Sequence, residues 1–349
     1  MHDLACVVHL HSVYSDGTGT VRQIVRAGRR AAADVVLLTD HDTLEAKRRG
    51  EEGWYDGVLL LVGEEVSPRR RDHYLAFGIE EEIDHDGLDA AAICEAVRAA
   101  GGFGFAAHPF SRGSMRFKRA GKGMPFGGLD CDALHGIELW SFVTDTGERL
   151  ESVPQMLRFF AAPGRVLDHP PERNLREWER LCRERRTVAI GGLDVHQFGL
   201  RVGPFVPLRL MAYHRSFRYL RTHVLCERAP TGELDHDREQ VYAALRAGRC
   251  YLAVDSIAPA RGFDFWAEGP DGELPMGSEA PAVPLTLRAR LPQPARLRLL
   301  RDGELVEAED DATELARRIA EPGVYRVEAR RRRHRRDRTW VISNPIYLR

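Results

Sequence analysis

Two histidines, His9 and His11, stand at the end of the first apolar run of the chain. In a β-strand, residues two apart project from one face, so both imidazoles are expected to point the same way. Asp16, in the Ser-Asp-Gly turn that follows, adds a carboxylate. This combination favours a metal site over a hydrophobic core. Because His-x-His pairs also occur by chance on half-exposed strands, the other strand ends decide between the two interpretations.

Histidines and carboxylates also flank the later apolar runs, at residues 35–38, 58–62, 74–79, 103–107 and 188–192. The full set of candidate ligands is His9, His11, Asp16, His41, Glu65, His73, His108, Asp194 and His196. Imidazoles and carboxylates without cysteine suit Zn, Mn or Fe. Nine ligands are too many for one ion but enough for two or three. Two metals about 3.5–4 Å apart can clamp a phosphoryl oxygen and generate hydroxide from water.

Each candidate also has a simpler interpretation as a core or turn residue. Glu64 and Glu65 compete for one ligand position. Asp40 and Asp42 flank His41 and are expected to orient or cap rather than to bind metal. The repetition of the same chemistry at separate strand ends argues for one shared site.

Helical patterns alternate with the apolar runs. Residues 20–33, 88–100 and 237–247 carry apolar side chains at helical spacing, and Asn174 with Glu177 resembles a capping-box start. Short strands alternating with helices predict an α/β domain with a mainly parallel sheet over residues 1–260. Barrels and open α/β sheets carry their sites at the carboxyl ends of strands, where the candidate ligands lie.

From about residue 261, apolar and polar residues alternate. Runs of this kind occupy residues 285–291 and 295–300, and shorter apolar runs follow at 324–328 and 340–342. They predict a small Ig-like β-sandwich over residues 261–349. The arginine-rich stretch at 330–338 fits a charged hairpin tip in that domain.

The composition is that of an ordinary soluble protein, with 349 residues, 43% hydrophobic, 30% charged and a net charge of −1. The length suits two domains, and the balanced charge argues against a polyanion binder. No run approaches the roughly 20 apolar residues of a membrane span, and the N-terminus has no signal pattern. The six scattered cysteines are expected to be reduced. We therefore expect a cytoplasmic protein; its oligomeric state is not indicated.

Taken in order, the strand-end motifs resemble those of the PHP (polymerase and histidinol phosphatase) superfamily. The resemblance covers roughly residues 5–200. The motifs are His9-Leu10-His11-Ser12 with Ser15-Asp16-Gly17, Thr39-Asp40-His41-Asp42, Gly63-Glu64-Glu65, Ala107-His108-Pro109 and Gly192-Leu193-Asp194-Val195-His196. Residues 243–249, 298–303, 322–326 and 340–347 are similar to one branch, the CehA/McbA-type metallohydrolases.

The resemblance implies a distorted (β/α)7 TIM-like barrel with a bi- or trinuclear metal site at the carboxyl-terminal rim of its strands. It selects Glu65 over Glu64, because the family pattern is Gly-x-Glu. Carried over to this chain, it assigns three metals: the first to His9, His11, Glu65 and Asp194, the second to Glu65, His73 and His108, and the third to Asp16, His41 and His196.

We expect a metal-dependent hydrolase that uses a metal-bound hydroxide, with phosphoester cleavage as the leading reaction. A basic, glycine-rich segment at residues 111–122 follows His108. Its Arg112 and Lys118, together with Arg201, are candidates for binding an anionic small-molecule substrate, although the segment also fits a solvated loop. The sequence shows no serine or cysteine nucleophile motif and singles out no proton donor.

Two other functions stay open. The same metals could hydrolyse a carbamate, an ester or an amide, as the branch resemblance suggests. Alternatively, the chain is a nucleic-acid-binding module with structural metals, in which the arginines at 330–333 contact phosphates. We regard nucleic acid as the weaker expectation for a partner, and a membrane is not expected.

Overall fold

The computed structural model describes residues 1–69, 71–114, 123–197, 199–202, 205–270, 272–333 and 335–349, with the backbone alone for 199–202 and 205–209. The helices are α1 (Val21–Arg30), α2 (Glu45–Arg48), α3 (Ala90–Ala99), α4 (Phe142–Glu148), α5 (Val153–Ala161), the 3-10 helix η1 (Pro163–Arg165), α6 (Glu172–Glu184), α7 (Tyr213–Ser216) and α8 (Leu234–Arg246).

The first twelve strands belong to the part of the chain that alternates with these helices. They are β1 (His2–Val8), β2 (Val35–His41), β3 (Gly53–Tyr55), β4 (Val58–Val66), β5 (Tyr74–Phe77), β6 (Phe103–Ala106), β7 (Gly136–Ser141), β8 (Val188–Gly192), β9 (Gly199–Val202), β10 (Phe205–Arg209), β11 (Leu220–Cys226) and β12 (Cys250–Val254). The fold is therefore mixed α/β, as predicted.

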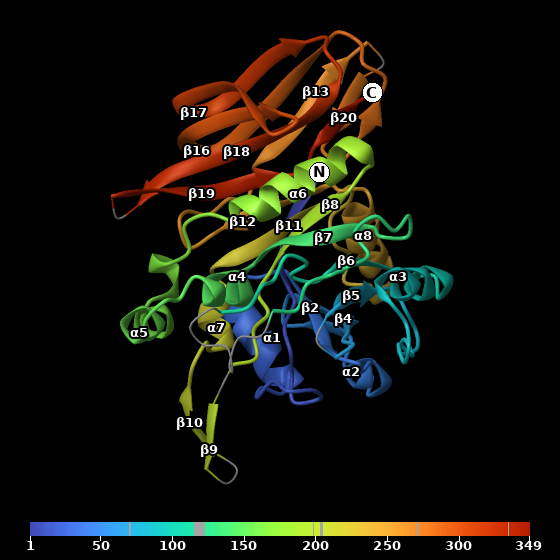
Figure 1. Ribbon diagram of the computed structural model, residues 1–349, viewed down its shortest axis with the longest axis vertical. Helices are drawn as coiled ribbons and strands as arrows, with labels where there is room; N and C mark the ends of the chain where they lie inside the picture. The colour runs from blue at the N-terminus through green and yellow to red at the C-terminus, as the bar shows by residue number, and fades with distance from the viewer. Residues whose placement is uncertain (70, 115–122, 198, 203–204, 271, 334) are drawn as a thin grey trace.

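The remaining strands are β13 (Asp264–Gly269), β14 (Gly272–Pro275), β15 (Glu279–Ala280), β16 (Leu285–Arg301), β17 (Glu304–Ile319), β18 (Gly323–Arg333), β19 (Arg336–Ser343) and β20 (Ile346–Leu348). Figure 1 shows these strands stacked above the α/β part, while the hairpin of β9 and β10 projects from the opposite end of the molecule.

The α/β part is built on a row of neighbouring strands. β1 pairs with β2 and β2 with β4 in parallel, and β6, β7 and β8 form a second parallel set. β5 joins the two sets through antiparallel pairs with β4 and β6, and β11 pairs antiparallel with β1. The sheet is thus less uniformly parallel than the sequence predicted.

The predicted closed barrel is not shown. Between β8 and β1 the described residues form one isolated bridge, Leu10 with Val195, and the Leu193 N–H donates to the Val8 carbonyl at 2.9 Å. The ladder therefore stays open at this point. An apolar run reveals that a strand is buried, but it does not reveal whether the first and last strands meet.

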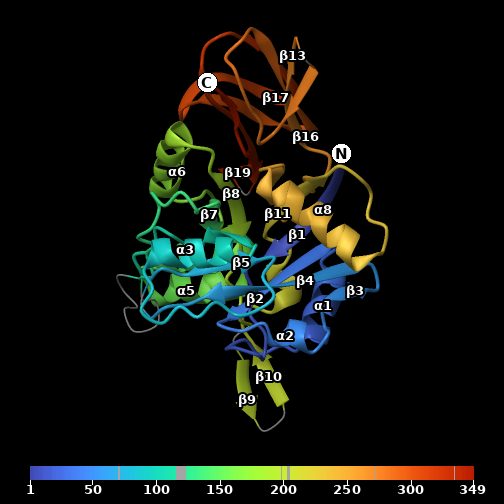
Figure 2. The ribbon, with the colours of Figure 1, turned by 90° about the vertical axis from the view of Figure 1, so that its right-hand side faces the viewer.

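Both faces of the sheet are covered, which explains why its strands are continuously apolar. In β2, Val36 and Leu38 lie in the same core as Ile24 of α1. Val35 and Leu37 lie in a second core with Leu245 of α8, on the opposite face. Figure 2 shows α8 lying along the strands on its side of the sheet.

The starts of α1, α3 and α5 follow local sequence signals, because a side chain caps each of them. Thr20 caps α1, and its hydroxyl accepts from the Gln23 N–H while the Gln23 side chain accepts from the Thr20 N–H. The predicted capping box at Asn174 is wrong, because α6 begins two residues earlier, after Pro171. The Asn174 amide instead donates to the buried Leu139 carbonyl at 3.0 Å.

The C-terminal strands enclose a third core. The two runs predicted at 285–291 and 295–300 form one strand, β16, whose register shifts around Pro292 and Pro294. Prolines interrupt the ladder because they lack an N–H, yet they keep the chain extended. β19 pairs with β12, so the ladder continues from the α/β part into the C-terminal strands. The predicted domain boundary near residue 260 stays a prediction.

The arginine-rich stretch forms the hairpin of β18 and β19. Several of its side chains already have partners within the chain. Arg336 and Arg338 pair with Asp168, and Arg330 pairs with Glu328. These pairs neutralise three of the arginines, whereas Arg331, Arg332 and Arg333 have no carboxylate within 4.0 Å in the described residues. Nucleic-acid binding through residues 330–333 therefore stays a prediction.

Candidate metal centre

The ends of neighbouring strands bring the candidate ligands together. β1, β2 and β4 run parallel and side by side, so their carboxyl ends meet at one edge of the sheet. His41 is the last residue of β2, and Glu65 lies opposite it in β4. His9 follows β1 directly, and His108 and Asp194 follow β6 and β8 by two residues.

The chain turns at His9 rather than continuing as a strand. β1 ends at Val8, and His9 has a left-handed backbone with φ of 62°. As a result Leu10 packs in the same core as Val7, although the two would lie on opposite faces of an unbroken strand. The prediction that His9 and His11 share one strand face is therefore wrong. Their imidazoles converge because of the turn.

Left-handed backbone recurs at two other candidate ligands. His108 has φ of 32° and Asp194 has φ of 50°. Residues other than glycine adopt this region infrequently, and such strained residues cluster at functional sites. Three strand ends thus share a sharp turn that aims a polar side chain at the same place.

The carboxylate of Glu65 lies among the histidines and is fully buried. Five imidazole nitrogens lie within 3.4 Å of its oxygens: His9 Nε2 at 3.2 Å, His11 Nε2 at 3.3 Å, His41 Nδ1 at 3.2 Å, His73 Nδ1 at 2.9 Å and His108 Nε2 at 3.4 Å. A carboxylate offers about four acceptor positions, so it cannot satisfy all these rings by hydrogen bonds. A carboxylate that bridges metal ions would be surrounded in this way.

Two further carboxylates extend the cluster. Asp194 Oδ1 lies 3.6 Å from Nε2 of both His9 and His11. Asp16 Oδ1 lies 3.1 Å from His196 Nε2 and 3.7 Å from His41 Nε2. Asp194 is enclosed, whereas 59% of the Asp16 side chain is exposed, so Asp16 marks the open rim of the centre.

The described residues form four groups whose ligand atoms lie within 4.8 Å of one another: His11, Asp16, His41 and His196; His9, Glu65 and His108; His9, His11 and Asp194; and His41, Glu65 and His73. The groups share members and make one continuous cluster. The first contains the third-metal set implied by the family resemblance. The resemblance places His73 and His108 on one metal, whereas here each joins Glu65 with a different histidine.

His11 shows that the cluster fits a metal. Both ring nitrogens are buried and have no hydrogen-bond partner in the part of the chain that the structure describes. Burial and the neighbouring His196 lower the pKa of His11 to about 3, so the ring is neutral, the form that binds metals. Such nitrogens are costly to bury unless an ion or another partner contacts them.

The carboxylates of the cluster are charged. Burial by itself raises the pKa of Glu65 and of Asp194, but the nearby imidazoles, with His9 the strongest, hold both pKa values well below their usual range. Burial lowers the pKa of His108, yet Glu65 and Asp194 raise it to about 9. Divalent ions could replace the protons that balance these carboxylates.

Glu138 is a supporting residue that the sequence analysis did not single out. It lies in β7, is fully buried, and its Oε1 is 2.9 Å from His9 Nδ1. Its Oε2 accepts from the His108 N–H at 2.8 Å. A carboxylate behind a ligand histidine fixes the orientation of the ring. The signal in the sequence was an acid within an otherwise apolar strand.

Two hydroxyl groups also hold the cluster in place. The Thr144 hydroxyl, on α4, donates to Asp194 Oδ2, which leaves Oδ1 toward His9 and His11. The Tyr213 hydroxyl donates to the His11 carbonyl at 2.6 Å and lies 3.2 Å from the His196 carbonyl. Neither residue could be identified from local sequence, because each acts over a long separation in the chain.

Asp40 and Glu64 lie beside the cluster without joining it. Asp40 accepts from the Ser12 N–H at 2.7 Å and from the Ser12 and Ser15 hydroxyls at 2.6 Å, so it fastens the turn between His11 and Asp16. Glu64 turns to the other face of β4, where its Oε2 accepts from the Ile83 N–H at 3.1 Å.

The predicted substrate-binding residues are only partly placed. Arg112 is exposed, and its backbone N–H donates to Glu148 at 2.6 Å. Glu148 also accepts from the Ser111 hydroxyl and pairs with Arg173, so it anchors the chain just after His108. Lys118 and the side chain of Arg201 lie outside the described residues.

The structure thus defines a mixed α/β protein with a buried centre of imidazoles and carboxylates that could hold divalent metals. No family model matches the chain. An uncharacterized protein of Methanocaldococcus jannaschii is 26% identical in an alignment of 119 residues that covers 30% of this chain and 67% of that protein.

Solved structures with a similar arrangement are distant. A two-domain protein from Bacteroides vulgatus, described as containing a predicted PHP-like metal-dependent phosphoesterase, is 16% identical, covers 98% of this chain and 95% of its own, and has a TM-score of 0.47. An amidohydrolase from Chromobacterium violaceum is 19% identical and has a TM-score of 0.30, and the match covers 58% of this chain and 90% of the amidohydrolase chain. Likenesses this distant carry no argument about the activity of this chain.

None of the helices in the described residues combines the length and the apolar character that crossing a membrane requires.

Proposed function

We propose that this protein is a metal-dependent hydrolase that cleaves phosphoesters at a centre of two or three divalent ions. The region 1–260 would carry the centre in a PHP-type fold, and 261–349 would be an accessory β-domain. The proposed ligands are His9, His11, Asp16, His41, Glu65, His73, His108, Asp194 and His196.

One observation carries the proposal: the buried Glu65 carboxylate has five imidazole nitrogens within 3.4 Å. Burying this much polar surface costs free energy, and metal coordination is the compensation that its donor set fits. Divalent ions in such a centre supply a water-derived nucleophile at neutral pH and withdraw charge from a substrate oxygen.

The residues of the chain would contribute orientation and shape. Glu138 holds the His9 ring, and Thr144 holds the Asp194 carboxylate, so both ligands present a fixed atom to the centre. Asp16 lies at the exposed rim, where substrate would enter. The phosphoester preference rests on the resemblance to the PHP superfamily and on the basic segment after His108.

A substrate panel tests this function. Protein purified without chelator is assayed with p-nitrophenyl phosphate, bis(p-nitrophenyl) phosphate and p-nitrophenyl acetate, with Mn²⁺, Zn²⁺ or Fe²⁺ added. We expect metal-dependent release of nitrophenol from a phosphoester. Activity on the acetate alone would overturn the phosphoester assignment, and activity that is insensitive to chelation would overturn the metal-dependent mechanism.

Two histidine variants, one at each end of β1, make the assay specific. His9→Ala should abolish the activity, because His9 contacts Glu65 and Asp194. His2→Ala is the matched control, since His2 is exposed at the start of β1, the strand that His9 directly follows. Equal loss of activity in both variants would show a general effect on folding instead of a ligand role.

A further inference from the structure

A cavity bordered by several arginines lies away from the metal centre. Its volume is about 820 Å³, and it is bordered by the end of α1, by α7 and the turn after it, by β11, and by the connection after β12. None of the nine proposed ligands lines it. It reaches β1 at Ala5, which lies roughly 13 Å along the strand from His9.

Five arginines line this cavity: Arg30, Arg215, Arg218, Arg221 and Arg261. Asp255 is the one carboxylate among its lining residues. This excess of positive charge is local, because the whole chain has a net charge of −1. A concave, positively charged wall concentrates anions from solution.

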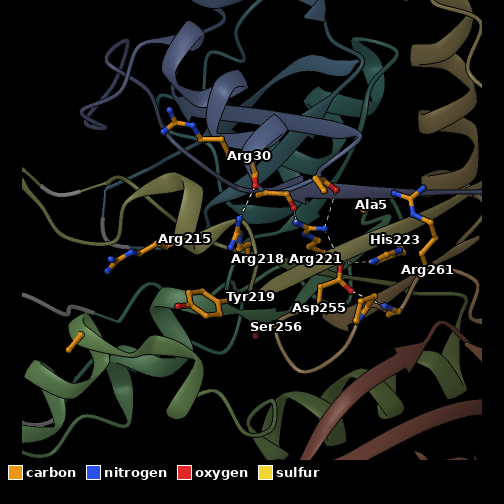
Figure 3. A pocket seen from close by; sticks show the side chains of 15 residues that line it. Ala5, Arg30, Arg215, Arg218, Tyr219, Arg221, His223, Asp255, Ser256 and Arg261 are labelled. Atoms are coloured by element: carbon orange, nitrogen blue, oxygen red, sulfur yellow. Dashed lines mark hydrogen bonds and ion pairs between the residues drawn. The ribbon is translucent and has the colours of Figure 1, made fainter. Parts of the chain in front are cut away.

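Two of the arginines are part of the wall. Arg221 is 4% exposed, pairs with Asp255 at 2.9 Å and donates to the Phe217 carbonyl at 2.7 Å. It also donates to carbonyls at the end of α1, so it joins α1, α7 and β11. Arg261 pairs with Asp34. Figure 3 shows the Arg221 and Asp255 pair at the centre of the cavity wall.

The other three arginines are available to a ligand. Arg30, Arg215 and Arg218 are exposed, and none has a carboxylate within 4.0 Å in the described parts of the chain. Arg218 donates one hydrogen bond, from Nη2 to the Arg30 carbonyl at 2.9 Å, and this bond does not involve its Nε or Nη1. Figure 3 shows Arg30 and Arg215 to the left of the Arg221 and Asp255 pair.

The cavity also has an apolar border. Tyr219 is half-buried and packs on Phe142 with ring centroids 5.1 Å apart, and Pro259 lies on the connection after β12. Guanidinium groups bind phosphate by paired, charge-assisted hydrogen bonds, and a cavity of this volume accommodates a small organic molecule. We propose that this cavity binds a small phosphate-bearing organic anion at a site separate from the metal centre.

Phenylphosphonate is a suitable probe, because it carries a phosphate-like dianion and a ring but no hydrolysable ester. Isothermal titration is performed on the wild type and on Arg215→Gln/Arg218→Gln. The double variant should raise the Kd about tenfold or more, since charge-assisted hydrogen bonds are lost. The control Arg22→Gln/Arg29→Gln removes two exposed arginines that do not line the cavity and should bind as the wild type does.

Two further arms separate the alternatives. Glu65→Gln, which disrupts the metal centre, should retain binding; loss of binding in this variant alone would place the ligand at the metals and overturn the proposal. Benzoate should bind much more weakly than phenylphosphonate, and equal binding would overturn the phosphate assignment. An unchanged Kd in Arg215→Gln/Arg218→Gln, with an unaltered thermal transition, would also overturn the site.

Discussion

Glu64 and Glu65 are consecutive residues of β4 whose carboxyl groups lie in opposite surroundings. Glu65 faces the histidine cluster, and although burial opposes ionisation, the imidazoles hold its pKa well below the usual range. Glu64 faces the Ile83 N–H on the other side of the strand, where burial raises its pKa to about 8. Alternation along the strand therefore separates a charged acid at the centre from a neutral acid in the core.

This pair yields the first prediction. Glu65→Gln should lower kcat/KM by more than about 100-fold, because even a carboxylate behind a metal ligand is worth 10–100-fold. Glu64→Gln should stay within about threefold of the wild type, since an amide replaces an acid that is already neutral near pH 7. Steady-state kinetics on the best phosphoester measures both. Comparable losses in the two variants would contradict the assignment of Glu65.

Glu138 should act through His9 and not by contacting substrate. Glu138→Gln should weaken metal binding by about 10–100-fold, because the amide cannot accept from both His9 and the His108 N–H as a carboxylate does. Competition with a chromogenic chelator gives the affinity. Excess metal should restore activity to Glu138→Gln but not to Glu65→Gln, and unchanged affinity would remove the orienting role.

Asp16 should control one ion at the rim. It contacts His196 and His41 but lies in none of the groups that contain Glu65. Asp16→Asn should therefore lower the metal content by one ion per chain and leave the thermal stability of the α/β part nearly unchanged. Asp56→Asn, another exposed carboxylate, is the control and should keep the full content. Loss of every ion in Asp16→Asn would argue against separate metal positions.

A buried ion cluster in the C-terminal strands makes a prediction about stability. Glu328 is 2% exposed and accepts from Arg298, Arg326 and Arg330, which lower its pKa to about 2 although burial opposes this. Glu328→Gln should reduce the free energy of unfolding by about 3 kcal/mol at neutral pH, because the buried Arg326 keeps only Glu179 as a carboxylate partner and the half-buried Arg298 loses its partner.

The pH dependence of this effect follows from the direction of the shift. The pKa of Glu328 in the folded protein lies below the value of 4.5 in the unfolded chain. The stabilisation by its carboxylate is therefore complete above pH 4.5 and is lost as the pH falls toward 2. The difference between wild type and Glu328→Gln in urea unfolding should accordingly shrink at about pH 3. Glu314→Gln, at an exposed position in β17, should show no such difference. A constant difference would contradict the ionic origin.

Much of the candidate site could be predicted from the sequence because its residues flank recognisable apolar runs. Each of the histidines and carboxylates proposed as ligands lies in the cluster, since parallel strands end at one edge and His73 directly precedes the antiparallel neighbour β5 at that same edge. Glu138 could not be predicted, because an acid in an apolar strand acquires a meaning only when its partner is known. That partner, His9, lies 129 residues earlier in the chain.

The fold was predictable at the level of its elements and less so in their pairing. Helical spacing located α1, α3 and α8, whose bounds fall within a few residues of the prediction. Two features depend on contacts far apart in sequence. They are the antiparallel pairs that β5 makes with β4 and β11 makes with β1, and the open ladder between β8 and β1. The turn at His9 was missed for a local reason, since a left-handed histidine has no signature in residue type.

The most direct test is the metal content of protein purified without chelator, measured by mass spectrometry for the wild type, Glu65→Gln and Glu64→Gln. Two or three divalent ions per chain are expected in the wild type and in Glu64→Gln, with a loss of at least one ion in Glu65→Gln. Equal metal content in all three proteins, or none in the wild type after growth with Mn²⁺, Zn²⁺ and Fe²⁺, would contradict a metal centre built around Glu65.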